Sequence, residues 1–338
     1  EPVSYSSGGH ILRFEGDWLV RESMVARSRS MKKIVDRIET LARGEQPVLI
    51  TGETGTGKEL AAEMIHALSG RADGPFVAVN CAAVADSIFE SEFNGHRRGA
   101  FTGASSDRTG FFEAASGGTL FLDEISELTN RQQAKLLRII ETGRFYRVGE
   151  TVERSVDVRI VSATNVHPDI LLESDRLRKD FYFRVCPQVV SLPPLRDRLQ
   201  DLIPLLAWFM DSGGKVFEIE DEALELLYDY HWPGNVRELR NLAKGLNLLR
   251  GSGGSIRSCD LPERIRSSRL AETGRCGNRG MLRRLSPGQI LERGNLEEVE
   301  DLLRRMLRDS GGNKSAVARR LGISRSTLYR KLAEISLS

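Results

Sequence analysis

Hydrophobic and polar positions follow two different periods along residues 25–193. Segments 59–68 and 131–141 have the 3.6-residue period of helices and lie between short apolar runs. These runs are rich in β-branched residues and bounded by turn residues: PVLITG (47–52), FVAVN (76–80), TLFLDE (119–124), VRIVSATN (158–165) and QVVSLP (188–193). Apolar strands that alternate with helices are typical of a parallel sheet covered on both faces. The pattern therefore predicts an α/β domain.

The pattern changes after residue 193. LPPLRDR (192–198) ends the alternation because two prolines interrupt any regular element. The helical period of DEALELLYDY and VRELRNLAKGLNLLR then predicts a helical subdomain. We divide the chain into a tail or remnant of an upstream region (1–24), an α/β domain (25–193), a helical subdomain (194–250), a Gly-, Ser- and Arg-rich linker with a short helix near 262–265 (251–295), and a helical C-terminal domain (296–338).

The segment GETGTGKE (52–59) follows the first predicted strand and opens a predicted helix. It matches the phosphate-binding pattern Gly-x4-Gly-Lys, in which backbone N–H groups close around phosphate oxygens that a Cβ would block. The helix N-terminus adds partial positive charge, and Lys58 reaches the terminal phosphates. Glu59 stands where Ser or Thr usually binds magnesium, so we expect that ligand elsewhere. The predicted nucleotide-binding residues are Gly52, Glu53, Thr54, Gly55, Thr56, Gly57, Lys58 and Glu59.

Polar side chains end two later strands of the predicted sheet. Asp123 and Glu124 follow an apolar run, and they suit a magnesium ligand and a group that orients the attacking water. Thr164 and Asn165 end the next run, where an amide can sense the γ-phosphate of a nucleotide. A strand C-cap is the ordinary alternative for Asn165. The sequence thus predicts ATP and Mg²⁺ as the cofactors.

Three arginines lie where they could reach a nucleotide. Arg178 and Arg184 precede the last strand of the sheet, and Arg237 follows a Pro-Gly turn at a helix start. Hydrolysis gains from positive charge on the phosphoryl group in transfer, and a neighbouring subunit often delivers such an arginine. For each of them a surface salt bridge is the ordinary alternative.

The last residues, GGNKSAVARRLGISRSTLYRKL (311–332), have the form helix, glycine-containing turn, helix. Ser324 can cap the second helix, whose first half exposes polar and basic groups as a recognition helix in the major groove does. A solvated basic hairpin is the alternative. The predicted DNA-binding residues are Arg325, Ser326, Thr327, Arg330 and Lys331.

The stretch GAFTGA (99–104) has no charge and no acid–base group. Two glycines in six residues disfavour both a helix and a buried strand. We predict a flexible loop that holds one bulky ring and one hydroxyl towards solvent. Its residues are Gly99, Ala100, Phe101, Thr102, Gly103 and Ala104.

Together these motifs give the chain a family resemblance. Residues 24–250 resemble the AAA+ domain of sigma-54-dependent transcription activators, the bacterial enhancer-binding proteins, and the tail resembles their Fis-type helix-turn-helix. GETGTGKE is a common P-loop sequence in this family, and GAFTGA is the family's most specific motif. Arg97 and Arg98 make the base of the loop more basic than usual, and Phe93-Asn94 replace a commoner Leu-Phe. The resemblance implies an α/β AAA+ P-loop NTPase with a parallel sheet, a helical lid subdomain and a C-terminal all-α helix-turn-helix domain.

The resemblance also implies a mechanism and its residues. The chain is expected to bind enhancer DNA and to use ATP hydrolysis to remodel the closed complex of sigma-54 RNA polymerase into an open complex. Asn80 corresponds to the asparagine that pairs with the Walker B glutamate, here Glu124, and relays the nucleotide state. Arg178 and Arg184 correspond to the trans-acting finger pair of a homo-oligomer, from a dimer to a hexameric or heptameric ring, and Arg237 to sensor II. Phe101 and Thr102 would lie at the tip of a loop that grips the sigma factor.

Composition indicates where the protein is located in the cell and shows that its charge is unevenly distributed along the chain. The 338 residues carry a net charge of +2, but residues 311–338 hold six basic groups against one acid, a local +5 that leaves −3 elsewhere. Four scattered cysteines (Cys81, Cys186, Cys259, Cys276) suit free thiols in a reducing cytoplasm. No apolar stretch approaches the roughly 20 residues of a membrane span, so we expect a cytoplasmic protein with no membrane partner.

Two other readings compete with an activator. One is a DNA-binding repressor that has lost sigma engagement, which the intact GAFTGA disfavours, and the other is a AAA+ DNA-processing motor. Residues 1–24 are too few for a receiver or ligand-sensing domain, so we expect that the sensor was removed or that another protein exerts control.

Overall fold

The computed structural model describes residues 10–11, 19–21, 24–174, 176–210, 218–250 and 255–267. Its centre is a five-stranded sheet in the order β12-β4-β11-β8-β5, in which every strand pair is parallel. The strands are β4 (Val48–Thr51), β5 (Phe76–Asn80), β8 (Thr119–Asp123), β11 (Arg159–Thr164) and β12 (Gln188–Ser191). These are the five apolar runs of the sequence, so the α/β prediction is confirmed.

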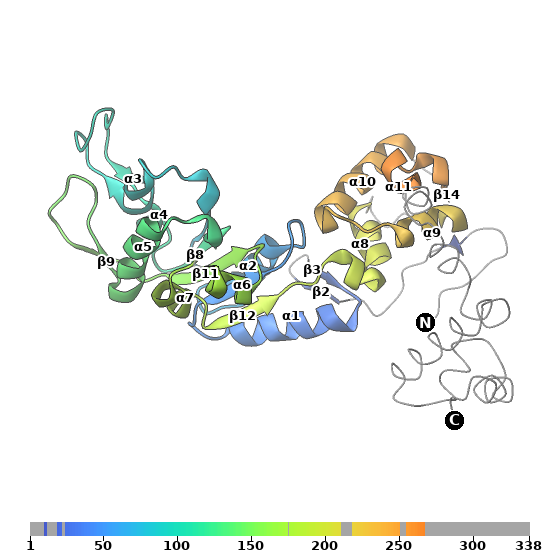
Figure 1. Cartoon of the computed structure of the whole chain (residues 1–338), viewed down its shortest axis with the longest axis horizontal. Coiled ribbons are helices and arrows are strands. Elements are labelled where there is room, and N and C mark those ends of the chain that lie inside the picture. Colours follow the sequence, from blue (N-terminus) through green and yellow to red (C-terminus); the bar gives the residue numbers. More distant parts are fainter. Residues whose placement is uncertain are drawn as a thin grey trace, which may run out of the picture. The chain divides into compact units, whose positions relative to one another are not determined.

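Helices cover both faces of this sheet (Figure 1). Val48 and Ile50 of β4 pack with α1 (Arg29–Ala42) and α2 (Lys58–Ala67). Leu49, between them, belongs to the core on the opposite face, because successive side chains of a strand point to opposite sides. That second core includes residues of α3 (Phe89–Asn94), α4 (Phe111–Ala114), α5 (Asn130–Thr142), α6 (Pro168–Glu173) and α7 (Lys179–Val185).

Local signals set the limits of the two long helices beside the sheet. The Ser28 side chain caps α1 by accepting from the Met31 N–H. Thr129 and Gln132 form a reciprocal capping box at the start of α5, and Gly143 ends that helix in the left-handed region at φ +64°. The ends of α5 therefore lie close to those that the sequence period predicts.

A helical lid follows β12, in agreement with the predicted helical subdomain. It contains η3 (Leu195–Asp197), η4 (Leu199–Asp201), α8 (Leu202–Phe209), α9 (Asp221–Asp229), α10 (Asn235–Arg250), η5 (Ser258–Asp260) and α11 (Glu263–Arg266). Trp232 and Leu239 are fully buried in its core, which is separate from the two cores of the sheet. Within the described part of the chain, no helix has both the length and the apolar character that crossing a membrane requires.

Short strands complete the described structure. They are β1 (His10–Ile11), β2 (Leu19–Arg21), β3 (Met24–Ala26), β6 (Gly95–His96), β7 (Arg108–Thr109), β9 (Arg144–Phe145), β10 (Arg154–Ser155), β13 (Glu218–Ile219) and β14 (Ser255–Ile256), and the short helices η1 (Cys81–Ala83) and η2 (Ile125–Glu127) lie beside β5 and β8. The hairpin of β2 and β3 was not expected from the weak patterning there. Val25 packs in the lid core while Met24 and Ala26 pack in a core of the sheet, so β3 joins the two subdomains.

A buried carboxylate makes a second joint between the lid and the α/β domain. Asp201, at the end of η4, is fully buried. Its Oδ1 accepts from the backbone N–H groups of Arg27 and Ser28, each at 2.6 Å, and its Oδ2 accepts from Ser28 Oγ at 2.7 Å. A buried charge with three donors is well satisfied, and removing it leaves those donors without an acceptor.

The first prediction concerns this joint. We expect Asp201→Ala to lower the free energy of unfolding by about 3 kcal/mol, because buried N–H and O–H groups lose a charged acceptor. Urea unfolding followed by circular dichroism measures the change. Asp197→Ala, at an exposed position four residues earlier, is the matched control and should change little. A loss below about 1 kcal/mol for Asp201→Ala would show that the joint does not stabilise the fold.

Candidate functional site

Four neighbouring strands end at one edge of the sheet, and the polar residues of the predicted site follow them. The phosphate-binding segment 52–59 follows β4, Asn80 ends β5, Asp123 ends β8, and Asn165 follows β11. Asn80 and Asp123 are register partners. The Gly52 N–H donates to the Thr164 carbonyl at 3.3 Å, which fixes the start of the P-loop against β11. Ligands of open α/β sheets bind at this edge.

The P-loop backbone follows a path that requires glycine at two positions. Gly55 and Gly57 have φ values of +82° and +105°, in the left-handed region. A Cβ on Gly55 would lie 2.4 Å from the Gly234 carbonyl oxygen of the lid, so side chains are excluded there by contact as well. A Cβ on Gly57 would meet no heavy atom within 4 Å. The loop thus leads into α2, whose first N–H groups have no partner within the helix.

Lys58 begins α2 and is only 8% exposed. Its ammonium donates to the Gly52 carbonyl at 2.9 Å and to the Glu53 carbonyl at 3.4 Å. Burial lowers the pKa of Lys58, and the carboxylates of Glu124 and Asp123 act in the opposite direction. The cation is therefore held inside the P-loop in the field of the two acids.

Glu124 adopts a left-handed backbone conformation, with φ of +52°, directly after β8. Its Oε2 is buried, and no hydrogen-bond partner for it exists among the described residues. Asp123 Oδ1 accepts from the Glu124 N–H at 3.0 Å. A buried carboxylate oxygen without a donor is costly, so this atom fits a water or cation bound between the acids and the P-loop.

Among the described residues, the side chains of the two predicted sensor amides make no hydrogen bond to the acids at this edge. Asn80 is exposed, and its Oδ1 accepts from the Ala82 N–H at 2.9 Å. No hydrogen bond joins Asn80 to Glu124 in the part of the chain described, so the pair that the resemblance implies is not formed here. Asn165 is exposed, and beside it Thr164 Oγ1 donates to Ser126 Oγ at 3.0 Å.

The lid reaches the P-loop through the start of α10. The N–H groups of Val236 and Arg237 donate to the Gly55 carbonyl at 2.9 and 3.3 Å. The Arg237 guanidinium is exposed, and its charge contributes to the lowered pKa of Lys58. The structure therefore brings Arg237 to the predicted nucleotide site.

The other two predicted arginines are engaged elsewhere in their own chain. Arg178 forms an exposed ion pair with Asp180 at 2.7 Å, and Arg184 Nη2 donates to the Ile140 carbonyl at 3.0 Å. Neither makes a hydrogen bond to a P-loop residue among those that the structure describes. The geometry does not join them to the site of the same chain.

Gln133 is a residue of this region that the sequence analysis missed. It is fully buried in α5, and its Oε1 accepts from the Arg178 N–H at 2.8 Å. Its Nε2 donates to the carbonyls of Leu128 and Arg176 at 2.8 and 2.9 Å. It thus ties the backbone before α7 to the segment after the acids. A glutamine in a helical pattern gives no signal of such contacts.

The GAFTGA segment lies in the loop between β6 and β7. The Gly99 N–H donates to the Ala104 carbonyl at 2.8 Å, which closes the loop at its base. Phe101 is 44% exposed and meets the ring of His96 edge-on, with centroids 5.0 Å apart. Thr102 is exposed and Ala104 is buried. The tip thus presents a ring and a hydroxyl, as the sequence predicts.

Ion pairs surround the base of this loop. Arg97 pairs with Asp107 and, at 3.2 Å, with Glu150, which also pairs with Arg154 at 2.9 Å. Because Arg97 and Asp107 are about half exposed, the pair between them contributes little by itself. Together the ion pairs connect the GAFTGA loop to the loop between β9 and β10.

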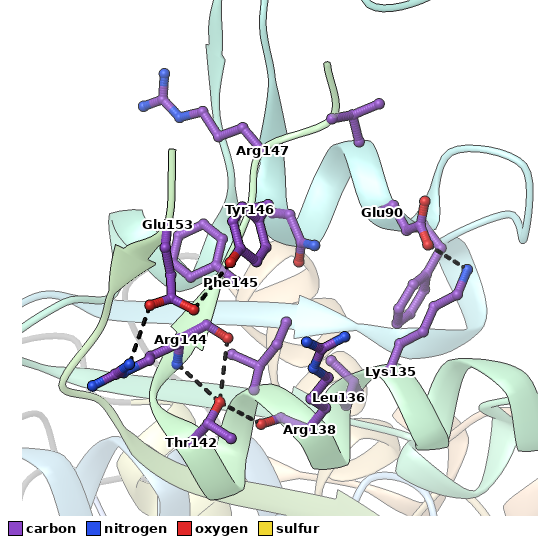
Figure 2. Close-up of a pocket in the computed structure, with 14 residues that line it drawn as sticks. Glu90, Lys135, Leu136, Arg138, Thr142, Arg144, Phe145, Tyr146, Arg147 and Glu153 are labelled. Carbon is purple, nitrogen blue, oxygen red and sulfur yellow. Dashed lines mark hydrogen bonds and ion pairs between the residues drawn. The ribbon is translucent and has the colours of Figure 1, made fainter. Parts of the chain in front are cut away.

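A cavity of about 500 Å³ lies apart from the P-loop, between α3, α5 and β9 (Figure 2). Lys135 and Glu90 pair across it at 2.7 Å, and Tyr146 donates to Glu153 at 3.1 Å. No P-loop residue or expected catalytic residue lines it. Within the described ranges, no cluster of three or more His, Cys, Asp or Glu side chains could hold a metal ion.

The five predicted DNA-binding residues, Arg325, Ser326, Thr327, Arg330 and Lys331, lie outside the described residues.

Comparisons with protein families cover most of the chain. The family model described as the sigma-54 interaction domain matches residues 24–191. The AAA+ ATPase lid domain matches residues 196–275, and the Fis family of bacterial regulatory proteins matches residues 295–334.

Curated relatives match three quarters or more of this chain in the three comparisons that follow. The transcriptional regulatory protein XylR of Pseudomonas putida is 39% identical over 93% of this chain and 57% of its own length. The regulatory protein LuxO of Vibrio parahaemolyticus is 38% identical over 92% of this chain and 69% of its own. The Nif-specific regulatory protein of Klebsiella pneumoniae is 44% identical over 75% of this chain and 50% of its own. The chain thus spans little more than half the length of some of these relatives.

Solved structures agree. NtrX from Brucella abortus, crystallised in complex with ATP, is 31% identical over 94% of this chain and 70% of its own, with a TM-score of 0.65. The same protein in a further crystal structure gives a TM-score of 0.68 at 32% identity. The family resemblance and the AAA+ fold are confirmed, and the chain belongs to the family of sigma-54-dependent AAA+ transcriptional regulators with a Fis-type helix-turn-helix.

Proposed function

We propose that this chain hydrolyses ATP and uses the energy to remodel the closed complex of sigma-54 RNA polymerase into an open complex, while bound to enhancer DNA. The observation that carries the proposal is that one α/β domain has both parts of such a motor. The carboxyl edge of its five-stranded sheet holds a P-loop with a buried lysine and two acids, and the exposed GAFTGA loop lies between β6 and β7, which follow β5 and α3 along the chain. A protein that bound sigma-54 without hydrolysing ATP would need the GAFTGA loop and not the P-loop with its two acids.

ATP binds in this proposal between the P-loop and the lid. The N–H groups of residues 52–59 and the start of α2 bind the phosphates, and Lys58 turns its ammonium from the loop carbonyls to the terminal phosphates. Arg237 adds positive charge from the lid side, where the N–H groups at the start of α10 already contact Gly55. NtrX was crystallised with ATP and with ADP, which supports nucleotide binding by this chain.

The acids at the end of β8 divide the remaining work. Asp123 would hold Mg²⁺, because Glu59 replaces the Ser or Thr that usually binds magnesium in the P-loop and Asp123 ends β8 at the same edge of the sheet as the P-loop. The ion, when bound, neutralises charge on the phosphates. Glu124 orients the attacking water and accepts its proton at Oε2, the atom for which the described residues offer no hydrogen-bond partner.

A homo-oligomer completes the site. Arg178 and Arg184 are exposed and bind groups of α7 and α5, so they are available to a neighbouring copy. A hexameric or heptameric ring of such copies would supply each P-loop with arginines from the next subunit. Asn80, beside Asp123 in register, would report the nucleotide state to the segment that leads to GAFTGA.

The tail supplies the DNA contacts in this proposal. The helix-turn-helix of residues 296–338 reads enhancer DNA through Arg325, Ser326, Thr327, Arg330 and Lys331, and the family match over 295–334 supports it. Paired tails would read a palindrome with half-sites about one helical turn apart. The site of action is the cytoplasm, where sigma-54 RNA polymerase acts on DNA.

The second prediction separates the loop from the ATPase. Thr102 is exposed at the loop tip, and no hydrogen bond joins it to the P-loop among the described residues, so we expect Thr102→Ala to retain most ATP turnover and to lose open-complex formation. Both activities are measured on one preparation, with sigma-54 polymerase and a supercoiled template. Lys58→Ala is the contrasting variant and should fail earlier, at nucleotide binding. Loss of turnover in proportion to open complexes in Thr102→Ala would make the loop part of the ATPase machinery.

The third prediction concerns the neighbouring subunit. We expect Arg184→Ala to bind ATP as the wild type does and to hydrolyse it poorly. Mixing it with Glu124→Gln subunits should restore part of the activity, because one class of interface then pairs an intact arginine with an intact Glu124. Turnover of the mixture is compared with the sum of the separate variants. A monomer as active as the oligomer, or a mixture no better than that sum, would refute action in trans.

A further inference from the structure

The side chain of the second P-loop residue is directed to the lid. Glu53 forms a two-point ion pair with Arg196 of η3: Arg196 Nη1 donates to Oε2 at 2.8 Å and Nη2 donates to Oε1 at 2.5 Å. The two side chains are equally exposed, each at 42%. Paired donors from one guanidinium fix both the distance and the plane of the carboxylate.

A buried lid residue shares the same carboxylate. Asn235 is fully buried, with a left-handed φ of +49°, and begins α10. Its Nδ2 donates to Glu53 Oε2 at 3.2 Å and to the Thr54 carbonyl at 3.1 Å. Its Oδ1 accepts from the Leu195 N–H at 2.8 Å. One amide thus joins the P-loop, the start of η3 and the start of α10.

We propose that Glu53 is a positioning residue that links the P-loop to the lid through Arg196 and Asn235 and thereby places Arg237 at the nucleotide. The inference rests on the proposed function, since it concerns how the lid meets a nucleotide in that site. Arg237 lies two residues after Asn235, in the first turn of α10. The contacts that hold Asn235 therefore also set where the Arg237 side chain begins.

Close contact between the backbones of the P-loop and α10 connects the position of Asn235 to that of Arg237. The Gly55 carbonyl accepts from Val236 and Arg237, and a Cβ on Gly55 would lie 2.4 Å from the Gly234 carbonyl oxygen. The backbone at the start of α10 is thus packed directly against the backbone of the P-loop. A shift of Asn235 away from Glu53 would move the Arg237 backbone by a similar distance.

Other joints keep the lid attached when Glu53 changes. Arg198 is buried and donates from Nη2 to the Thr56 carbonyl at 2.9 Å, and Asp201 binds the segment before α1. Variants at Glu53 should therefore fold, and their effect should appear in nucleotide binding. This separates a positioning role from a structural one.

The ionised form of Glu53 is the one that its contacts with Arg196 and Asn235 require. The hydrogen bond from Arg196, followed by that from Asn235, lowers the pKa of Glu53 to about 2. Because the folded-state pKa is lowered, the link is fully present above the ordinary pKa of about 4.5 and is lost only as the pH falls towards 2. The carboxylate is therefore ionised throughout the neutral range.

The fourth prediction uses a fluorescent ADP analogue and the full chain. We expect Glu53→Gln and Arg196→Gln each to weaken binding about fivefold, since one charge-assisted pair at a half-exposed position is lost. Arg196→Lys keeps the charge without the two-point geometry and should recover part of the affinity. In an Arg237→Ala background, Glu53→Gln should weaken binding less than twofold further, because Arg237 is the group that the link positions.

The controls separate folding, charge and function. Glu45→Gln removes an acid from another surface pair, Glu45 with Arg71 at 2.7 Å, and should bind the analogue as the wild type does. Thermal unfolding of every variant should stay close to that of the wild type. Unchanged affinity in Glu53→Gln, or a full fivefold loss in the Arg237→Ala background, would overturn the inference while the proposed function stands. A wild-type chain that fails to bind the analogue would refute the proposed function and the inference with it.

Discussion

The constraint on which this structure depends is the backbone path of the P-loop between the sheet and the lid. On one side the Gly52 N–H is bound to the Thr164 carbonyl of β11. On the other side the Gly55 carbonyl receives two N–H groups from α10. The left-handed φ values of Gly55 and Gly57 allow the chain to pass between these contacts. In the proposed function, a phosphate group bound there would contact the sheet and the lid at once, so that hydrolysis would move both.

The chain connects the carboxyl edge of this sheet to the GAFTGA loop. Asn80 and Asp123 end adjacent parallel strands in register, and the chain after Asn80 leads through α3 to GAFTGA. The loop itself is closed by a backbone hydrogen bond and surrounded by ion pairs, so its base is held while its tip presents Phe101 to solvent. The Arg97–Asp107 pair is about half exposed, and an exposed pair is weak enough to exchange partners. The proposed motor thus combines a rigid edge of the sheet with a loop that is held at its base and exposed at its tip.

Local patterns explain how much of this could be predicted. Val48 to Thr51 form a strand because alternating side chains fill two cores, and Lys58 lies in a motif whose spacing is set by phosphate geometry. The link at Glu53 could not be predicted, since its partner Asn235 is 182 residues away along the chain. An asparagine after a Pro-Gly turn is also ordinary and gives no signal of such a contact. Arg196 lay in a segment that the sequence marks mainly by its prolines. Long-range polar partners leave no periodic trace, and the hairpin of β2 and β3 was missed because its strands are too short to show one.

Hydrogen–deuterium exchange with and without ADP tests the central claim most directly, that a nucleotide binds between the P-loop and the start of α10. Amide exchange slows where backbone hydrogen bonds are protected from opening. We expect ADP to slow exchange in peptides covering residues 52–60 and residues 233–240 together, and to leave peptides around the cavity of Figure 2 unchanged. Protection of the P-loop with no change at 233–240, or no protection of either segment, would contradict the account.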